Sequence, residues 1–385
     1  MKLWQVAHIN RAALPSSTPP DFAFTYVDLG AVADGTVSVP DSTVTYADAP
    51  ERARRLAPPG STVVSTVRTY LRAAAAVPTT ASPLVFSTGF AVLEAKPLAH
   101  PAYLAYACQS DLFVDAVVAR STGVGYPAIG PTELADIDIT LPALDEQERI
   151  AKLLDDATTA LDQARELRAR QRRLFAERFD ALVDRVVAAA ADAPRTRLDA
   201  VCDILPGRTF ASSDFSADGP RLLRGINVGI GAVDWTEAVH WDGPVPDRYR
   251  LLAGDLVLAM DRPWIGGGVR LAFLTAADVP SVLVQRVARL RGSDGTDLRY
   301  LRWALHSRHF RDSVTLSGIS VPHLRAGQIA AFAPHLPPLA RQRALADELD
   351  RQSALTRDLA AAIDAQIEAL AQRRRALISE MCTAG

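Results

Sequence analysis

The polar residues whose spacing could support catalysis form only weak candidates in this sequence. Residues 94–96 (Glu-Ala-Lys), with Asp41 far upstream, have the residue types of half a nuclease metal site. The gap between them is long, and the end of a surface strand is the better interpretation. The glycine-rich segments 225–229 and 266–268 lack the spacing of a phosphate-binding loop, and we interpret them as turns.

Motifs of the common catalytic and metal sites are absent from the sequence. It has no Walker loop, HExxH, GxSxG or CxxC motif, and no Asn/Asp-Pro-Pro-aromatic tetrapeptide of the kind that amino-methyltransferases use. The seven histidines show no metal-ligand spacing, and His306 and His309 fit a solvated helix face. Cys108, Cys202 and Cys382 are too distant for a full set of disulfides, which favours a reducing cytosol. We therefore predict a chain that binds no metal or cofactor itself and is not an enzyme.

The clearest feature of the sequence is an internal duplication. Residues 141–149 (LPALDEQER) align with residues 336–344 (LPPLARQRA) at an offset of 195. Four further pairs of segments match in the same order with nearly the same offset: 6–9 with 201–204, 60–64 with 254–258, 102–107 with 299–304, and 122–127 with 317–322. Five ordered matches indicate two copies of one structural unit.

Both copies have the same predicted order of elements. Short β-rich runs come first, then a helix, one more strand, a turn with proline and a long helix. We place the runs at 62–66, 84–93, 255–260 and 281–290, the helices at 102–119 and 298–315, and the later strands at 137–141 and 331–336.

The two long helices carry heptad patterns. Leu154, Leu161, Phe175 and Leu182 share a spacing of seven, interrupted at Arg168, and the second copy repeats this pattern with Leu349, Ile363, Leu370 and Leu377. Sustained heptads flanked by charge favour coiled-coil packing. Because the two helices are copies, antiparallel packing against each other is the simplest arrangement. About 40 helical residues make a rod of roughly 60 Å, which would act as a spacer.

These patterns predict the fold class and the domains. The chain is expected to be α+β, with two pseudo-repeated mixed α/β domains separated by two long antiparallel coiled-coil helices. The first domain is placed at 1–144, the first long helix at 145–192, the second domain at 193–338 and the second long helix at 339–385.

Composition limits where the protein works and what it binds. With 385 residues, 49% hydrophobic and 22% charged, the chain is typical of a soluble globular protein. No apolar run reaches the roughly 18 residues of a membrane helix, so we expect a cytoplasmic protein that does not bind membranes. The net charge is only −2. A nucleic-acid-binding domain acting alone is usually basic, so any nonspecific contact of the isolated chain with phosphates should be weak.

Three segments resemble a known family. The junction at 141–150 (LPALDEQERI) resembles the signature that opens the long helices of type I restriction–modification specificity subunits. Residues 249–258 (YRLLAGDLVL) resemble the Leu-x-x-Gly-Asp-Ile-Leu segment of their target-recognition domains, and 222–228 (LLRGINV) are similar to their Leu-Arg-x-x-Asn-Ile segment. The order of domain, helix, domain and helix covers the whole chain. Two residues depart from the pattern: Arg341 replaces the Glu of Glu-Gln, and Ser61 replaces the Asp of Gly-Asp.

The resemblance implies a non-catalytic DNA-reading subunit of a restriction system that serves in phage defence. Each target-recognition domain would contact one half of a bipartite site in double-stranded DNA. The helices would set the distance between the halves and dock two adenine methyltransferase (M) subunits, and a motor-nuclease (R) subunit would join for cleavage. S-adenosylmethionine, ATP and Mg²⁺ would belong to those partners. The candidate partner contacts lie at the two junctions: Glu146, Gln147, Arg149, Gln342 and Arg343.

Reading base edges requires Arg, Asn, Gln, Ser or Thr side chains on loops held by a rigid scaffold. The second copy offers several such residues near strand ends, and the repeat assigns counterparts in the first. The candidates are Arg224, Asn227, Arg262, Trp264, Ser320, His323 and Arg325 in the second copy, and Arg68, Thr69, Arg72 and Tyr126 in the first. The arginines between 165 and 173 share their helix with Glu and Asp residues, and a solvated helix face explains them better than contact with phosphates.

Two other functions remain open. A coiled-coil scaffold whose duplicated domains bind protein would explain the acidic first domain and the lack of a basic face. An enzyme with an unrecognised site is less well supported, because the two copies share no polar catalytic set.

Overall fold

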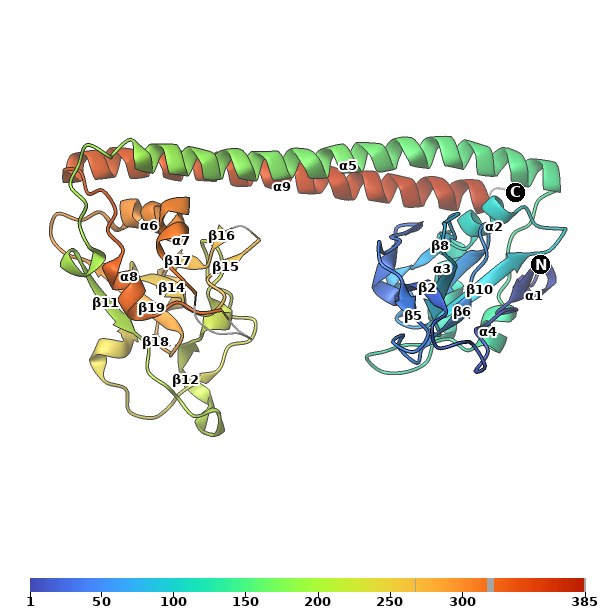
Figure 1. Ribbon diagram of the computed structural model, residues 1–385, viewed down its shortest axis with the longest axis horizontal. Helices are drawn as coiled ribbons and strands as arrows, with labels where there is room; N and C mark the ends of the chain where they lie inside the picture. The colour runs from blue at the N-terminus through green and yellow to red at the C-terminus, as the bar shows by residue number, and fades with distance from the viewer. Residues whose placement is uncertain (267, 317–321, 384–385) are drawn as a thin grey trace. The chain divides into compact units, whose positions relative to one another are not determined.

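The computed structural model describes residues 1–266, 268–316 and 322–383, and the chain divides into two compact units. Unit 1 contains Met1–Gln171 and Ala362–Gly385, and unit 2 contains Arg172–Ala361. Each unit therefore combines one mixed α/β domain with parts of both long helices (Figure 1).

The domain of unit 1 is built on two four-stranded sheets. The sheet β1-β10-β7-β8 is antiparallel, and the sheet β5-β2-β9-β6 contains one parallel pair, β2 with β9. Val63, Phe86 and Phe90 pack in the core between the sheets, so the central strands read as continuous apolar runs. The strands are β1 (Ala7–Ile9), β2 (Ala23–Val27), β3 (Val32–Ala33), β4 (Thr36–Val37), β5 (Val44–Thr45), β6 (Ala53–Leu56), β7 (Thr62–Ser65), β8 (Ala74–Ala76), β9 (Leu84–Ser87) and β10 (Phe90–Ala95).

The domain of unit 2 repeats this plan. Its antiparallel sheet β11-β19-β14-β17 corresponds to β1-β10-β7-β8, and its second sheet β12-β18-β13 again contains one parallel pair, β12 with β18. The strands are β11 (Cys202–Pro206), β12 (Ser216–Leu223), β13 (Arg250–Leu251), β14 (Leu256–Ala259), β15 (Trp264–Ile265), β16 (Gly268–Val269), β17 (Leu271–Phe273), β18 (Ser281–Leu283) and β19 (Val287–Gly292).

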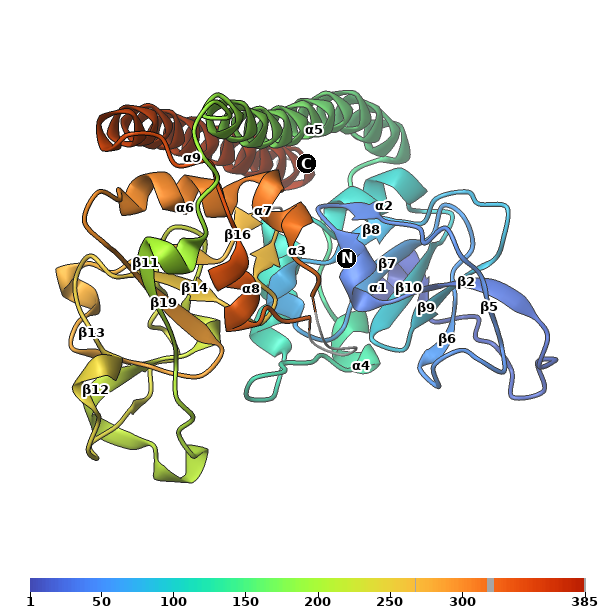
Figure 2. The ribbon, with the colours of Figure 1, turned by 60° about the vertical axis from the view of Figure 1, so that its left-hand side comes forward.

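One short helix of unit 1, α2, and two of unit 2, α6 and α7, lie between the sheets and the long helices (Figures 1 and 2). Each predicted helix is two helices in the structure, because a serine starts a new turn: Ser110 accepts a hydrogen bond from the amide of Phe113, and Ser307 occupies the equivalent position. The short helices are α1 (Leu3–Val6), α2 (Pro101–Ala107), α3 (Asp111–Arg120) and α4 (Pro131–Ala135) in unit 1, and α6 (Leu298–His306), α7 (Arg308–Ser313) and α8 (Ala326–Ala331) in unit 2.

The strands predicted at 137–141 and 331–336 are not formed. Each segment instead lies beside the first residues of its own domain, where the amides of Leu3 and Leu198 donate to the carbonyls of Ile137 and Phe332, both at 2.8 Å. Each segment forms only an isolated β-bridge with the start of its domain and no continuous strand ladder. The alternation of apolar residues in these segments therefore reflects burial of one side of the segment. The predicted runs 84–93 and 281–290 are also each two strands, which belong to different sheets.

The two long helices, α5 (Leu144–Ala188) and α9 (Leu339–Thr383), have 45 residues each. In unit 1, Leu154 near the start of α5 shares a core with Ile378 near the end of α9. In unit 2, Val183 near the end of α5 shares a core with Leu349 near the start of α9. The helices are therefore packed antiparallel, which confirms the predicted fold class (Figure 1). Ala371 and Ile378 are more deeply buried than the predicted Leu370 and Leu377, because a straight helix of 3.6 residues per turn drifts from a strict heptad.

Candidate nucleic-acid interface and helix junctions

An arginine with left-handed backbone follows the central strand of each unit. Arg68 follows β7 with φ 49°, and Arg262 follows β14 with φ 42°. The amide of Arg68 donates to the carbonyl of Pro127 at 2.7 Å, and the amide of Arg262 donates to the carbonyl of Pro322 at 2.8 Å. Residues other than glycine rarely adopt this conformation, and such positions cluster at functional sites. Both units thus hold an exposed arginine in the same unusual geometry.

In unit 1, Arg68 lies against an exposed aromatic ring. Its guanidinium carbon is 4.6 Å from the centre of the Tyr126 ring, and Tyr126 is 68% exposed. Tyr70 and Leu71, which come directly after the buried Thr69, are also more than half exposed. This surface combines a cation with aromatic and aliphatic side chains, a composition suited to phosphates and base edges.

The other two candidates of unit 1 have internal partners. Thr69 is buried, and its hydroxyl hydrogen-bonds to the hydroxyl of Ser121 at 2.8 Å. Arg72 forms an ion pair with Asp111 at 2.5 Å and donates to the carbonyl of Gln109 at 3.3 Å. Thr69 therefore supports the loop from inside, and the charge of Arg72 is balanced within the domain.

In unit 2, Arg262 and His323 come together through paired backbone. Asp261 and His323 form an antiparallel bridge, and Arg262 itself is exposed. Trp264 is half-buried beside Phe310, with 6.1 Å between ring centres, and so supports this loop. Arg325 is exposed at the start of α8. Ser320 lies outside the described residues.

Arg224 precedes the short 3₁₀ helix Gly225–Asn227, and Asn227 is its last residue. Asn227 is buried: its Oδ1 accepts from the amide of Arg224 at 3.1 Å and its Nδ2 donates to the carbonyl of Asp234 at 2.9 Å. The Arg224 guanidinium donates to the carbonyl of Glu237. Asn227 thus fixes the shape of this turn from within.

Arg270 links two of the candidate loops, and the sequence did not indicate it. It is buried, donates to the carbonyls of Val228 at 2.9 Å and Asp261 at 3.0 Å, and also donates to the carbonyl of Gly225. Burial lowers the pKa of this guanidinium. One side chain therefore ties the Arg224 turn to the Arg262 loop. Nothing in the sequence marks it, because it is a single arginine in the short connection between β16 and β17.

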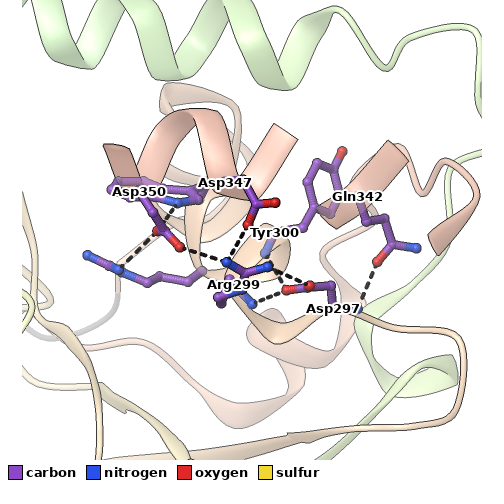
Figure 3. Close-up of polar contacts among 8 residues, drawn as sticks. Asp297, Arg299, Tyr300, Gln342, Asp347 and Asp350 are labelled. Carbon is purple, nitrogen blue, oxygen red and sulfur yellow. Dashed lines mark hydrogen bonds and ion pairs between the residues drawn. The ribbon is translucent and has the colours of Figure 1, made fainter. Parts of the chain in front are cut away.

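The glutamine of each junction motif is buried and clamps the start of a long helix. Gln147 accepts from the amide of His100 at 2.8 Å and donates to the carbonyls of Leu98 at 3.0 Å and Pro142 at 2.9 Å. Gln342 makes the same three contacts. Its Oε1 accepts from the amide of Asp297 at 2.9 Å (Figure 3), and its Nε2 donates to the carbonyls of Gly295 and Pro337 at 3.2 and 2.8 Å. Both side chains satisfy buried backbone groups, and each is only 1% exposed.

A second contact attaches the short helix of each domain to the following long helix. The Tyr106 hydroxyl donates to Asp155 Oδ1 at 2.7 Å, and the Trp303 indole donates to Asp350 Oδ1 at 2.9 Å. In unit 2, Arg299 adds ion pairs to Asp297, Asp347 and Asp350 (Figure 3).

The remaining junction candidates are at the surface. Glu146 and Arg149 form a bidentate ion pair at 2.6 and 2.7 Å, which lowers the pKa of the Glu146 carboxyl. Arg343 is exposed on α9. These three side chains, unlike the two glutamines, are accessible to a partner.

The described residues contain no group of three or more His, Cys, Asp or Glu that could hold a metal ion. Within the same part of the chain, no helix is long and apolar enough to cross a membrane.

Comparison with known proteins agrees with this geometry. Residues 2–169 match the family described as Type I restriction modification DNA specificity domain. The chain is 29% identical over 248 residues to the type I restriction enzyme MjaVIII specificity subunit of Methanocaldococcus jannaschii, covering 60% of this chain and 58% of that protein. It is 30% identical over 159 residues to the EcoAI specificity subunit of Escherichia coli, covering 40% of this chain and 27% of that protein.

A solved structure shows the same fold. A chain from a study of complex assembly and conformational transition of the type I R-M system aligns with a TM-score of 0.72 at 23% identity, covering 99% of this chain and 96% of that one. Together with the duplicated domains and paired long helices, these matches make the chain similar to type I restriction–modification specificity subunits in sequence and fold. The chain spans 58% and 27% of the length of these two curated relatives.

Proposed function

We propose that this protein is the DNA sequence-specificity subunit of a type I restriction–modification complex, in which each domain reads one half of a bipartite site. The observation that carries the proposal is the repeated pair Arg68 and Arg262, each exposed after a central strand and each anchored to a proline carbonyl. Two equivalent, rigidly held arginines are what a reader of two separate half-sites requires, because arginine can bind a guanine edge through two hydrogen bonds.

The reading surface of each domain is the loop around that arginine. In unit 1 it comprises Arg68 and Tyr126, and in unit 2 it comprises Arg262, His323 and Arg325, with Arg224 attached through Arg270. Thr69, Asn227 and Trp264 hold these loops in shape. Ser320 and Arg72 remain predicted contacts.

The long helices are the spacer and the docking surface for two adenine methyltransferase subunits, with Glu146, Arg149 and Arg343 in contact with them. Methyl transfer from S-adenosylmethionine and ATP- and Mg²⁺-dependent translocation belong to the partner subunits, the latter to a motor-nuclease subunit. The net charge of −2 fits this division of labour, since partners would supply most phosphate contacts.

The test is a map of adenine methylation made with the assembled complex of this chain and its methyltransferase. The wild-type complex should methylate one split, asymmetric sequence. Arg68→Ala and Arg262→Ala should each reduce discrimination at a different half-site by about 1–3 kcal/mol, the value of a bidentate arginine–guanine contact. Arg120→Ala, an exposed arginine at the end of α3, is the matched control.

Two results would contradict the proposal. Methylation without sequence preference would favour the duplicated scaffold that binds protein. Loss of both half-sites in each single variant would show that the two domains do not read separately.

The spacer role has its own test. Inserting seven residues into α5 and seven into α9 lengthens each helix by about 10 Å. The preferred gap between the half-sites should then widen, or methylation should cease. An unchanged gap would show that the long helices do not set the spacing between the half-sites.

A further inference from the structure

Each domain is held by both long helices. Besides the junction with the long helix that follows it in sequence, each domain contacts the last turns of the other long helix. In unit 1, the amide of Asp111, the first residue of α3, donates to Ser379 Oγ of α9 at 2.9 Å. In unit 2, the amide of Arg308, the first residue of α7, donates to Asp184 Oδ1 of α5 at 2.7 Å. The two contacts are equivalent in the repeat and satisfy an amide at a helix start.

In unit 1 the end of α9 contributes a buried charge as well. Arg374 is only 6% exposed, and it donates to Asp162 Oδ2 of α5 at 3.3 Å and to Gln109 Oε1 after α2 at 3.1 Å. Its guanidinium also lies beneath the turn between β3 and β4, because a Cβ at Gly35 would be 2.5 Å from Arg374 Nη2. Arg374 thus fastens two parts of the domain to the helix pair.

Neighbouring contacts strengthen this attachment. Asp34 in the same turn pairs with Arg165 of α5 at 2.6 Å. Cys382, one turn beyond Ile378, is buried with Cys108 in the core of unit 1. The last turns of α9 are therefore part of the packing of a domain more than 200 positions earlier in the chain.

The equivalent surface of unit 2 is aromatic. Phe179, which corresponds to Arg374 in the repeat, packs on Trp303 of α6 with 5.5 Å between ring centres. Asp180 Oδ1 accepts a hydrogen bond from His306 Nε2 at 3.0 Å. The role of the helix end is the same, although its chemistry differs.

We infer that the end of α9 positions the first reading surface and the end of α5 positions the second. Arg374 and Asp184 are then positioning residues, and each acts on the domain that its own long helix does not directly follow in sequence. Each domain has one junction with the helix that follows it, and the second attachment fixes the domain against rotation about that junction. The inference rests on the proposed function, and it predicts that a change in the second long helix disturbs the first half-site.

The structural arm of the experiment measures thiol labelling of the full-length chain by iodoacetamide, resolved by mass spectrometry. Arg374→Ala should accelerate labelling of Cys382 by on the order of tenfold, because loss of hydrogen bonds from a buried charged group favours local opening. Cys202, which is buried in unit 2, should keep its wild-type rate. Arg373→Ala, an exposed neighbour on α9, is the matched control, and Ser379→Ala serves as a milder variant should Arg374→Ala fail to fold.

The functional arm uses the methylation map of the assembled complex. Arg374→Ala and Ser379→Ala should relax the first half-site only, and Asp184→Ala should relax the second only. Arg374→Lys, which keeps the charge, should recover part of the loss. Unchanged Cys382 labelling, equal acceleration at Cys202, or an effect of Arg374→Ala on the second half-site would each overturn the inference. If the wild-type complex shows no split site, the proposed function fails, while thiol labelling still decides whether the helix end holds the domain.

Discussion

The guanidinium of Arg68 lies 4.6 Å above the centre of the Tyr126 ring, and both side chains are exposed. The backbone amide of Arg68 is also fixed to the carbonyl next to that ring, at Pro127. Two loops far apart in sequence thereby present one preorganised cation–aromatic pair. Preorganisation lowers the entropic cost of ordering a long side chain at an interface.

Removing the ring should weaken reading of the first half-site. Tyr126→Leu is expected to lower methylation at sites that match the first half by two- to fivefold, from the loss of about 0.5–1 kcal/mol of cation–π energy. Tyr126→Phe keeps the ring and should retain wild-type levels. Methylation kinetics on short duplexes with one altered half-site measure this effect, and equal losses in the two variants would assign the hydroxyl, and not the ring, to the interaction.

Removing a junction glutamine should destabilise the protein without changing the structure of the reading loops. Gln342→Met leaves the amide of Asp297 and the carbonyls of Gly295 and Pro337 without partners, and should cost about 1–3 kcal/mol in free energy of unfolding. Urea denaturation followed by tryptophan fluorescence measures this loss. Gln352→Met, half-buried further along α9, is the control. An unchanged free energy of unfolding in Gln342→Met would mean that solvent replaces the three hydrogen bonds.

Replacing Arg270 should impair the second half-site selectively. Arg270→Met leaves the carbonyls of Gly225, Val228 and Asp261 without their donor and separates the Arg224 turn from the Arg262 loop. We expect a loss of about 1–3 kcal/mol in stability together with relaxed methylation at the second half-site. Arg250→Met, at an exposed arginine of the same domain whose side chain pairs with Asp247, should change neither. Relaxation confined to the first half-site would refute this role.

The raised pKa of Tyr106 predicts that the free energy of unfolding falls at alkaline pH. Burial raises the pKa of its phenol to about 12 from an ordinary value near 10. Because the folded-state pKa is above the unfolded-state value, the protonated phenol contributes stability that is complete below pH 10 and is lost as pH rises toward 12. Tyr106→Phe removes this titration and should flatten the fall in unfolding free energy over that window. Tyr300, whose pKa is also raised to about 12, will still titrate, so the flattening should be partial.

A profile identical to wild type in Tyr106→Phe would show that Tyr106 is not buried as described. Chemical denaturation at closely spaced pH values between 9 and 12 provides the comparison, with Tyr70→Phe, an exposed tyrosine, as the control.

The sequence alone determined the architecture. Segment matches at a nearly constant offset and the heptads of the long helices identified two copies of one unit and an antiparallel helix pair, because duplication and helical period are properties of residue order. It also placed Arg68 and Arg262 at equivalent positions. It could not separate surface residues from supporting ones: Asn227, Thr69, Gln147 and Gln342 looked like contact residues but are buried.

Tertiary structure alone decided which polar side chains face solvent and which satisfy backbone groups, since burial depends on segments distant in the chain. Arg270 acquires its role only where two loops meet, and Arg374 only where the end of α9 reaches the domain of unit 1. Neither residue carries a local signal, because a lone arginine between two short strands or on a charged helix is expected to be solvated unless the fold brings carbonyls or carboxylates to it.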